Sequence, residues 1–115
     1  MRAANLPGVV AIVAVVDEIA AGFAMLTVHG GARASLDAIA VDAAHRGRGV
    51  GKALLAGAES AARRRRALEL RLVTAEANVA ALDLFLRSGF EIVERLERYY
   101  PRGQNAVVMR KELAP

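Results

Sequence analysis

The chain has 115 residues, a hydrophobic fraction of 55% and a formal net charge of +4. One domain spanning residues 1–115 accounts for that length. The absence of cysteine excludes disulfides, a thiol nucleophile and a zinc–thiolate site, so we expect no metal. The apolar run Val9–Val16 is too short to cross a membrane, and no secretory leader is recognisable. We therefore expect a cytoplasmic protein.

The positive charge favours an anionic partner, which is either a nucleic acid or a phosphorylated cofactor. Aromatic residues make up only 4% of the chain, which argues against stacking on single-stranded nucleic acid. The run Arg63–Arg66 suits either a nucleic-acid contact or a solvated helix end that complements the helix dipole, and we favour the helix end. No nucleic-acid recognition motif accompanies the run, so binding of nucleic acid is not expected.

The first part of the chain predicts three strands. Val9–Val16 and Ile19–Val28 are apolar runs separated by Asp17–Glu18, which is the pattern of a β-hairpin. Residues 29–31 indicate a loop, and Ser35–Val41 is typical of a third strand.

The remaining elements alternate between helix and strand. Apolar residues recur at helical spacing from Val50 onward and end at the arginine run. Further along, the pattern predicts a strand over Leu68–Thr74, a helix capped by Asn78 and ended by Gly89, and strands over Phe90–Val93 and Ala106–Lys111. The predicted order, β-β-β-α-β-α-β-β, indicates an α/β (α+β) fold with a mixed, mostly antiparallel sheet.

A glycine-rich loop, Arg46-Gly47-Arg48-Gly49-Val50-Gly51, precedes the first predicted helix. Closely spaced glycines at a strand-to-helix junction let unpaired helix amides approach a phosphate. The dinucleotide-binding G-x-G-x-x-G pattern fails at Lys52, and the P-loop pattern fails at Arg46 and Ala53. A phosphate site of another kind and a merely tight turn both stay open.

The loop, with its surroundings, resembles the GNAT superfamily of acyl-coenzyme A N-acyltransferases. The loop matches that family's signature Q/R-x-x-G-x-G/A, and the match extends through the chain in the right order. The other matching segments are Ala20–Phe23, Ile39–Asp42, Asn78 with Ala81, Leu84–Phe85, Gly89–Phe90, Tyr99–Tyr100, Ala106 and Met109. The segment with Tyr99–Tyr100, Ala106 and Met109 is similar to the branch that acetylates the N-terminal alanine of ribosomal proteins.

This resemblance implies transfer of an acetyl group from acetyl-coenzyme A to a primary amine. It also implies a V-shaped splay between the strands near Val41 and Val73 that admits the cofactor. Residues implied to bind the cofactor are Ile39, Ala40, Val41, Arg46, Gly47, Arg48, Gly49, Val50, Gly51, Lys52, Asn78 and Phe85.

The chain departs from the family at two chemical positions. The resemblance implies a glutamate base of the N-terminal acetyltransferase branch at the position of Val73, and a tyrosine acid near the thioester sulfur at the position of Phe85. Candidate replacements are Glu76, Asp37, Tyr99 and Tyr100, each with a structural alternative as a solvated carboxylate or a core-capping ring. His29 and His45 are expected in loops without a catalytic role.

Two functions follow from these observations. The first is an N-acetyltransferase that acts on a protein or peptide N-terminus or on a small-molecule amine. The second is a weak or inactive acetyl-coenzyme A-binding module that serves as a sensor or scaffold. The family's N-terminal strand and two helices are expected to be missing, because the first predicted strand starts at Val9. The sheet face that these missing elements would leave exposed predicts a homodimer. A misplaced start codon is the competing explanation for the missing elements.

Overall fold

A β-hairpin forms the first part of the sheet in the computed structural model, which describes residues 2–6, 8–30 and 32–113. Its strands are β2 (Val9–Val16) and β3 (Ile19–His29), as the apolar runs predict. Asp17 and Glu18 both have positive φ, 49° and 64°, which is the sign that a tight type I′ hairpin turn requires. The third predicted strand is also present, and it starts two residues earlier than predicted, as β4 (Arg33–Val41).

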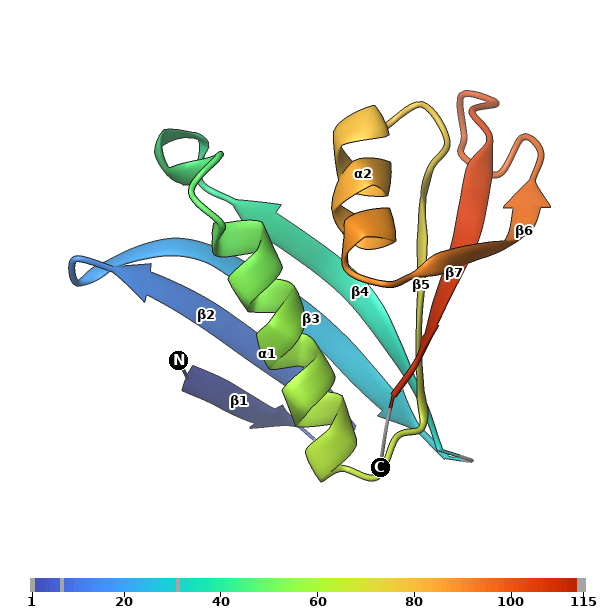
Figure 1. Cartoon of the computed structure of the whole chain (residues 1–115). Helices are drawn as coiled ribbons and strands as arrows, with labels where there is room; N and C mark the ends of the chain where they lie inside the picture. The colour runs from blue at the N-terminus through green and yellow to red at the C-terminus, as the bar shows by residue number, and fades with distance from the viewer. Residues whose placement is uncertain (1, 7, 31, 114–115) are drawn as a thin grey trace.

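In the part of the chain that the structure describes, seven strands form one sheet in the order β1-β2-β3-β4-β5-β7-β6 (Figure 1). The remaining strands are β1 (Arg2–Leu6), β5 (Glu69–Ala75), β6 (Glu91–Leu96) and β7 (Ala106–Glu112). Neighbours are antiparallel except β4 and β5, which confirms the mixed, mostly antiparallel sheet. The prediction that the first strand starts at Val9 is wrong, because β1 pairs with β2 ahead of it. Residues 2–6 lack β-branched side chains, so their strand carries no local signal.

The α-helices of the described residues lie in front of the sheet in Figure 1. Helix α1 (Val50–Arg64) packs on β2, β3 and β4, and its Leu54 and Leu55 are fully buried. Helix α2 (Val79–Arg87) begins at Asn78, whose Oδ1 accepts a hydrogen bond from the Ala81 amide at 3.2 Å. A short 3₁₀ helix, η1 (Ala43–His45), precedes the glycine-rich loop.

The parallel strands β4 and β5 part soon after they meet. Their ladder joins Arg33 to Glu69, Ala34 to Leu70 and Ser35 to Arg71, and beyond these pairs the strands diverge. Figure 1 shows the resulting V, with α2 beside its open end. The splay predicted between the strands near Val41 and Val73 is therefore confirmed. It leaves the β5-facing edge of β4 open to a ligand.

No helix of the described ranges has the length and apolar character needed to cross a bilayer. The cytoplasmic location stays a prediction.

Candidate active site

The glycine-rich loop delivers the start of α1 to the open end of the V. Gly47 and Gly49 have φ of 76° and 78°, a left-handed backbone that favours glycine. The helical ladder begins with the bond from the Ala53 amide to the Gly49 carbonyl at 3.0 Å. The amides of the first helical turn, from Val50 onward, therefore precede the ladder, and no side chain caps this end. Such a helix start is suited to phosphate oxygens.

The other residues of the loop have different surroundings. The Arg46 amide donates to the Ala43 carbonyl at 3.4 Å, so it is partly engaged in closing η1. A Cβ at Gly51 would lie 3.3 Å from the Leu84 side chain and 3.7 Å from Val41. Gly51 therefore allows α1, α2 and β4 to approach one another, which is a packing role. Arg48 and Lys52 are exposed beside the helix start.

A first hollow of about 180 Å³ lies where β4 and β5 part, on the side of α2. Ile39 from β4 and Val73 from β5 form its walls, and α2 contributes Asn78 and Phe85. Phe85 is buried, and its ring meets Phe90 edge-on with centroids 5.8 Å apart. The splay thus brings together residues predicted to bind the pantetheine arm, although their roles stay predictions.

A second hollow of about 410 Å³ adjoins the same gap on the opposite face of the sheet. Strand alternation places Arg71 and Val73 on this face, because Leu70 and Leu72 turn into the core. Tyr99 and Tyr100 close the hollow with rings at 89° and centroids 5.0 Å apart. The two hollows share Leu36, Asp37, Leu72 and Val73 as lining residues.

Glu76 lines neither of these hollows. Arg95 donates two hydrogen bonds to its carboxylate, and Asn105 Nδ2 lies 3.4 Å from Oε1. The hydrogen bond from Arg95 lowers the pKa of Glu76, assisted by Asn105 and opposed by desolvation. A carboxylate held in its ionised form is a weak proton acceptor, so this geometry disfavours the predicted role of Glu76 as base.

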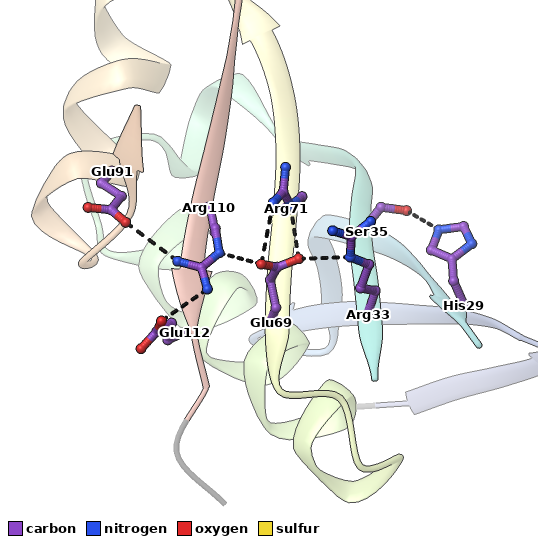
Figure 2. A network of polar contacts seen from close by, with 8 residues as sticks. All are labelled: His29, Arg33, Ser35, Glu69, Arg71, Glu91, Arg110 and Glu112. Atoms are coloured by element: carbon purple, nitrogen blue, oxygen red, sulfur yellow. Dashed lines mark hydrogen bonds and ion pairs between the residues drawn. The ribbon is translucent and has the colours of Figure 1, made fainter. Parts of the chain in front are cut away.

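An ion network ties the strands together at the closed end of the V (Figure 2). The carboxylate of Glu69 in β5 forms ion pairs with three guanidinium groups: Arg33 of β4, Arg71 of β5 and Arg110 of β7. Hydrogen bonds from Arg71 and then Arg110 lower the pKa of Glu69 to about 2, against a desolvation effect that raises it. Arg71 is thereby held at the edge of the second hollow.

Sequence reasoning missed Arg71 and Ser35 as lining residues and misplaced one histidine. His29 ends β3 instead of lying in a loop, and its Nε2 is 2.9 Å from Ser35 Oγ. Ser35 and Asp37 alternate along β4, so their shared open face was readable from strand periodicity. The contact with His29 needed the β3–β4 register.

Comparison with known proteins gives these hollows a context. Residues 2–90 match the model of the acetyltransferase (GNAT) family. Curated protein sequences give no significant match. Among solved structures, nourseothricin acetyltransferase is 30% identical with a TM-score of 0.87, the alignment covering 94% of this chain and 67% of that one. The ribosomal-protein-S18-alanine N-acetyltransferase from Escherichia coli is 26% identical with a TM-score of 0.87, covering 96% and 73%.

A third similar structure contains the cofactor. It is a protein from Bacillus anthracis str. Ames in complex with acetyl coenzyme A. Its sequence is 26% identical to this chain with a TM-score of 0.88, and the alignment covers 96% of this chain and 65% of that one. The residues described above fit the same cofactor, since an uncapped helix start suits its phosphates and the gap beside Asn78 suits its extended arm. Acetyl-coenzyme A is the cofactor of this fold, and the chain belongs to the GNAT family of acetyltransferases.

Proposed function

We propose that this chain transfers an acetyl group from acetyl-coenzyme A to the primary amine of a peptide or protein N-terminus. The observation that carries the proposal is the pair of hollows that meet where β4 and β5 part. One hollow lies on the side of α2, and the other opens on the opposite face beside Tyr99 and Tyr100. This arrangement lets an acyl donor and an acceptor approach the same point from two sides.

On the donor side, acetyl-coenzyme A supplies a thioester whose C–S bond breaks as the amide bond forms. We assign its phosphates to the amides of Gly47 to Lys52 and to the side chains of Arg46 and Arg48. The free edge of β4 at Ile39, Ala40 and Val41 would pair with the pantetheine arm as an added strand does. Asn78 and Phe85 line the same gap.

The acceptor side supports a peptide substrate. The second hollow holds an aromatic pair and both signs of charge, Asp37 and Arg71, which suits an amine followed by a polar backbone. The similar Escherichia coli enzyme is named for a protein N-terminal alanine, whereas nourseothricin acetyltransferase is named for a small molecule. Tyr99 and Tyr100 are the groups on this face able to give a proton to the departing thiolate.

Calorimetry and thiol release test the proposal. Wild-type protein should bind acetyl-coenzyme A saturably and release free thiol with short peptides more rapidly than with small amines. Gly49→Glu should raise the apparent dissociation constant about tenfold or more, about 1.4 kcal/mol per decade, because it adds a negative charge at the helix start. Gly103→Glu is the matched control, since Gly103 also has a positive φ, 84°, and a Cβ there meets open space. Unchanged affinity in folded Gly49→Glu would refute the loop assignment.

The alternative function is an acetyl-coenzyme A-binding module without turnover. It is favoured by Val73 and Phe85, which line the first hollow and which the family resemblance aligns with a glutamate base and a tyrosine acid. Saturable binding with no thiol release across peptide and amine panels would establish this alternative and refute the transferase.

We also propose that the chain forms a homodimer through the part of the sheet face opposite the helices that surrounds Phe23, leaving the acceptor hollow between β4 and β5 uncovered. Phe23 and Met25 of β3 are 41% and 37% exposed, and the register sets Phe23 between Val13 and Ala40. An apolar patch without charge can face a second copy of itself without repulsion. Light scattering after size exclusion should give a dimer and, for Phe23→Lys, a monomer. A monomeric wild type at high micromolar concentration would refute this association.

A further inference from the structure

Four polar side chains form a continuous hydrogen-bonded chain on the open face of β3 and β4. Asp37 Oδ2 accepts from the Thr27 hydroxyl at 2.5 Å, and Asp37 Oδ1 accepts from the Ser35 hydroxyl at 3.0 Å. Ser35 Oγ lies 2.9 Å from His29 Nε2 (Figure 2). The antiparallel register places Thr27 opposite Ser35, which explains how the Thr27 hydroxyl reaches the carboxylate of Asp37, ten residues further along the sequence.

The donors and acceptors among these four side chains set the direction of the hydrogen bonds. An ionised Asp37 only accepts, so both hydroxyl hydrogens point toward it. The Ser35 oxygen is then free to accept, and His29 Nε2–H is the group that donates to it. Reversal of the Ser35 hydroxyl and of the histidine tautomer would carry a proton from Asp37 to the ring. Thr27 donates to the same carboxylate without this connection to His29.

The two ends of this series of hydrogen-bonded side chains, Asp37 and His29, lie in different environments. Asp37 lines both hollows at the point where β4 and β5 part, whereas His29 is exposed at the end of β3. The charged and titratable groups around Asp37 on this face are Arg33 of β4, Glu69 and Arg71 of β5, Arg110 of β7, Tyr99 and Tyr100. Among these groups, Glu69 is held ionised by the arginines. Asp37 is thus the carboxylate of this face that lines the acceptor hollow.

We propose that Asp37 accepts the proton of the acceptor amine and that Ser35 and His29 pass it to solvent. This inference rests on the proposed acetyl transfer. The ammonium group loses one proton to Asp37, its nitrogen then bonds to the acetyl carbon, and the C–S bond breaks. The second nitrogen proton ends on the departing sulfur. One proton per turnover therefore leaves through Asp37, Ser35 and His29. Asp37 is a catalytic residue in this scheme, and Ser35 and His29 are positioning residues.

Paired hydroxyl deletions separate proton transfer from simple support of the carboxylate. Thr27→Val and Ser35→Ala each remove one hydrogen bond to Asp37, but only Ser35→Ala cuts the connection to His29. A purely structural role predicts equal losses in the two variants. The proposal predicts a larger fall in kcat for Ser35→Ala, by about tenfold, with KM for the peptide little changed.

The test is thiol release by the full chain with acetyl-coenzyme A and the best peptide of the panel. Asp37→Asn should lose about 100-fold or more in kcat, the usual contribution of a general base. His29→Gln should lose about tenfold, and added imidazole should restore its rate and that of no other variant. In the Ser35→Ala background, His29→Gln should cost nothing further. Asp83→Asn, which removes an exposed carboxylate paired with Arg87 on α2, is the matched control.

The outcomes distinguish this inference from the function on which it rests. Absence of thiol release by the wild type overturns both. An active wild type with an undiminished Asp37→Asn variant leaves the transferase standing and overturns the base. Equal losses for Thr27→Val and Ser35→Ala, or no rescue of His29→Gln by imidazole, overturn the relay. Circular dichroism spectra and melting temperatures like those of the wild type confirm that each variant folds.

Discussion

Glu69 joins three strands at the closed end of the V, so its replacement tests the electrostatics of the fold. Its carboxylate meets guanidinium groups from β4, β5 and β7, and its side chain is only 12% exposed. A folded-state pKa of about 2 against an ordinary 4.5 corresponds to at most about 3.5 kcal/mol, at about 1.4 kcal/mol per pKa unit. Since Arg33 and Arg71 are 62% and 37% exposed, screening should reduce this to about 1–2 kcal/mol.

The sign of the pH dependence follows from the direction of that shift. Because folding lowers the pKa of Glu69, its contribution is fully present above pH 4.5 and is lost as pH falls toward about 2. Glu69→Gln should therefore be less stable than wild type by about 1–2 kcal/mol at pH 7. This difference in the free energy of unfolding should narrow steadily below pH 4.5.

Urea unfolding followed by circular dichroism at a series of pH values between 7 and 3 measures this gap directly. Glu94→Gln, on exposed β6, is the control for loss of one negative charge. A Glu69→Gln variant as stable as wild type at pH 7 would refute the reasoning. A gap that stays constant with pH would assign the loss to packing instead of charge.

Three further variants test local features by thermal unfolding and thiol release. Gly22→Ala should lower stability by about 1–3 kcal/mol, because its Cβ would lie 2.6 Å from the Ala40 carbonyl oxygen, and an unchanged melting temperature would contradict that contact. Asn78→Ala should cost about 1 kcal/mol through loss of the cap to Ala81, with Asn78→Asp, which preserves it, as control. Phe85→Tyr should raise kcat if a missing acid limits the rate, and no change would leave Phe85 as packing.

Predictions based on local chain physics agree with the structure. Helical periodicity indicated α1, and the capping chemistry of Asn78 and the left-handed Gly89, with φ of 93°, bounded α2. The β1 strand was missed because residues 2–6 have little β propensity, and pairing with β2 compensates for this. His29 was assigned to a loop because the glycines after it suggested an early end to the strand.

Long-range pairing decided the candidate site. The sequence by itself determined the glycine-rich loop, the helix that follows it and the family resemblance, since these depend on neighbouring residues and on residue types that favour one backbone conformation. Only the tertiary structure decided where β4 and β5 part, which hollows open there, and that Asp37 meets Thr27 or Glu69 meets Arg110 across 41 residues. Strand register depends on the packing of the whole sheet, so no local pattern specifies those contacts.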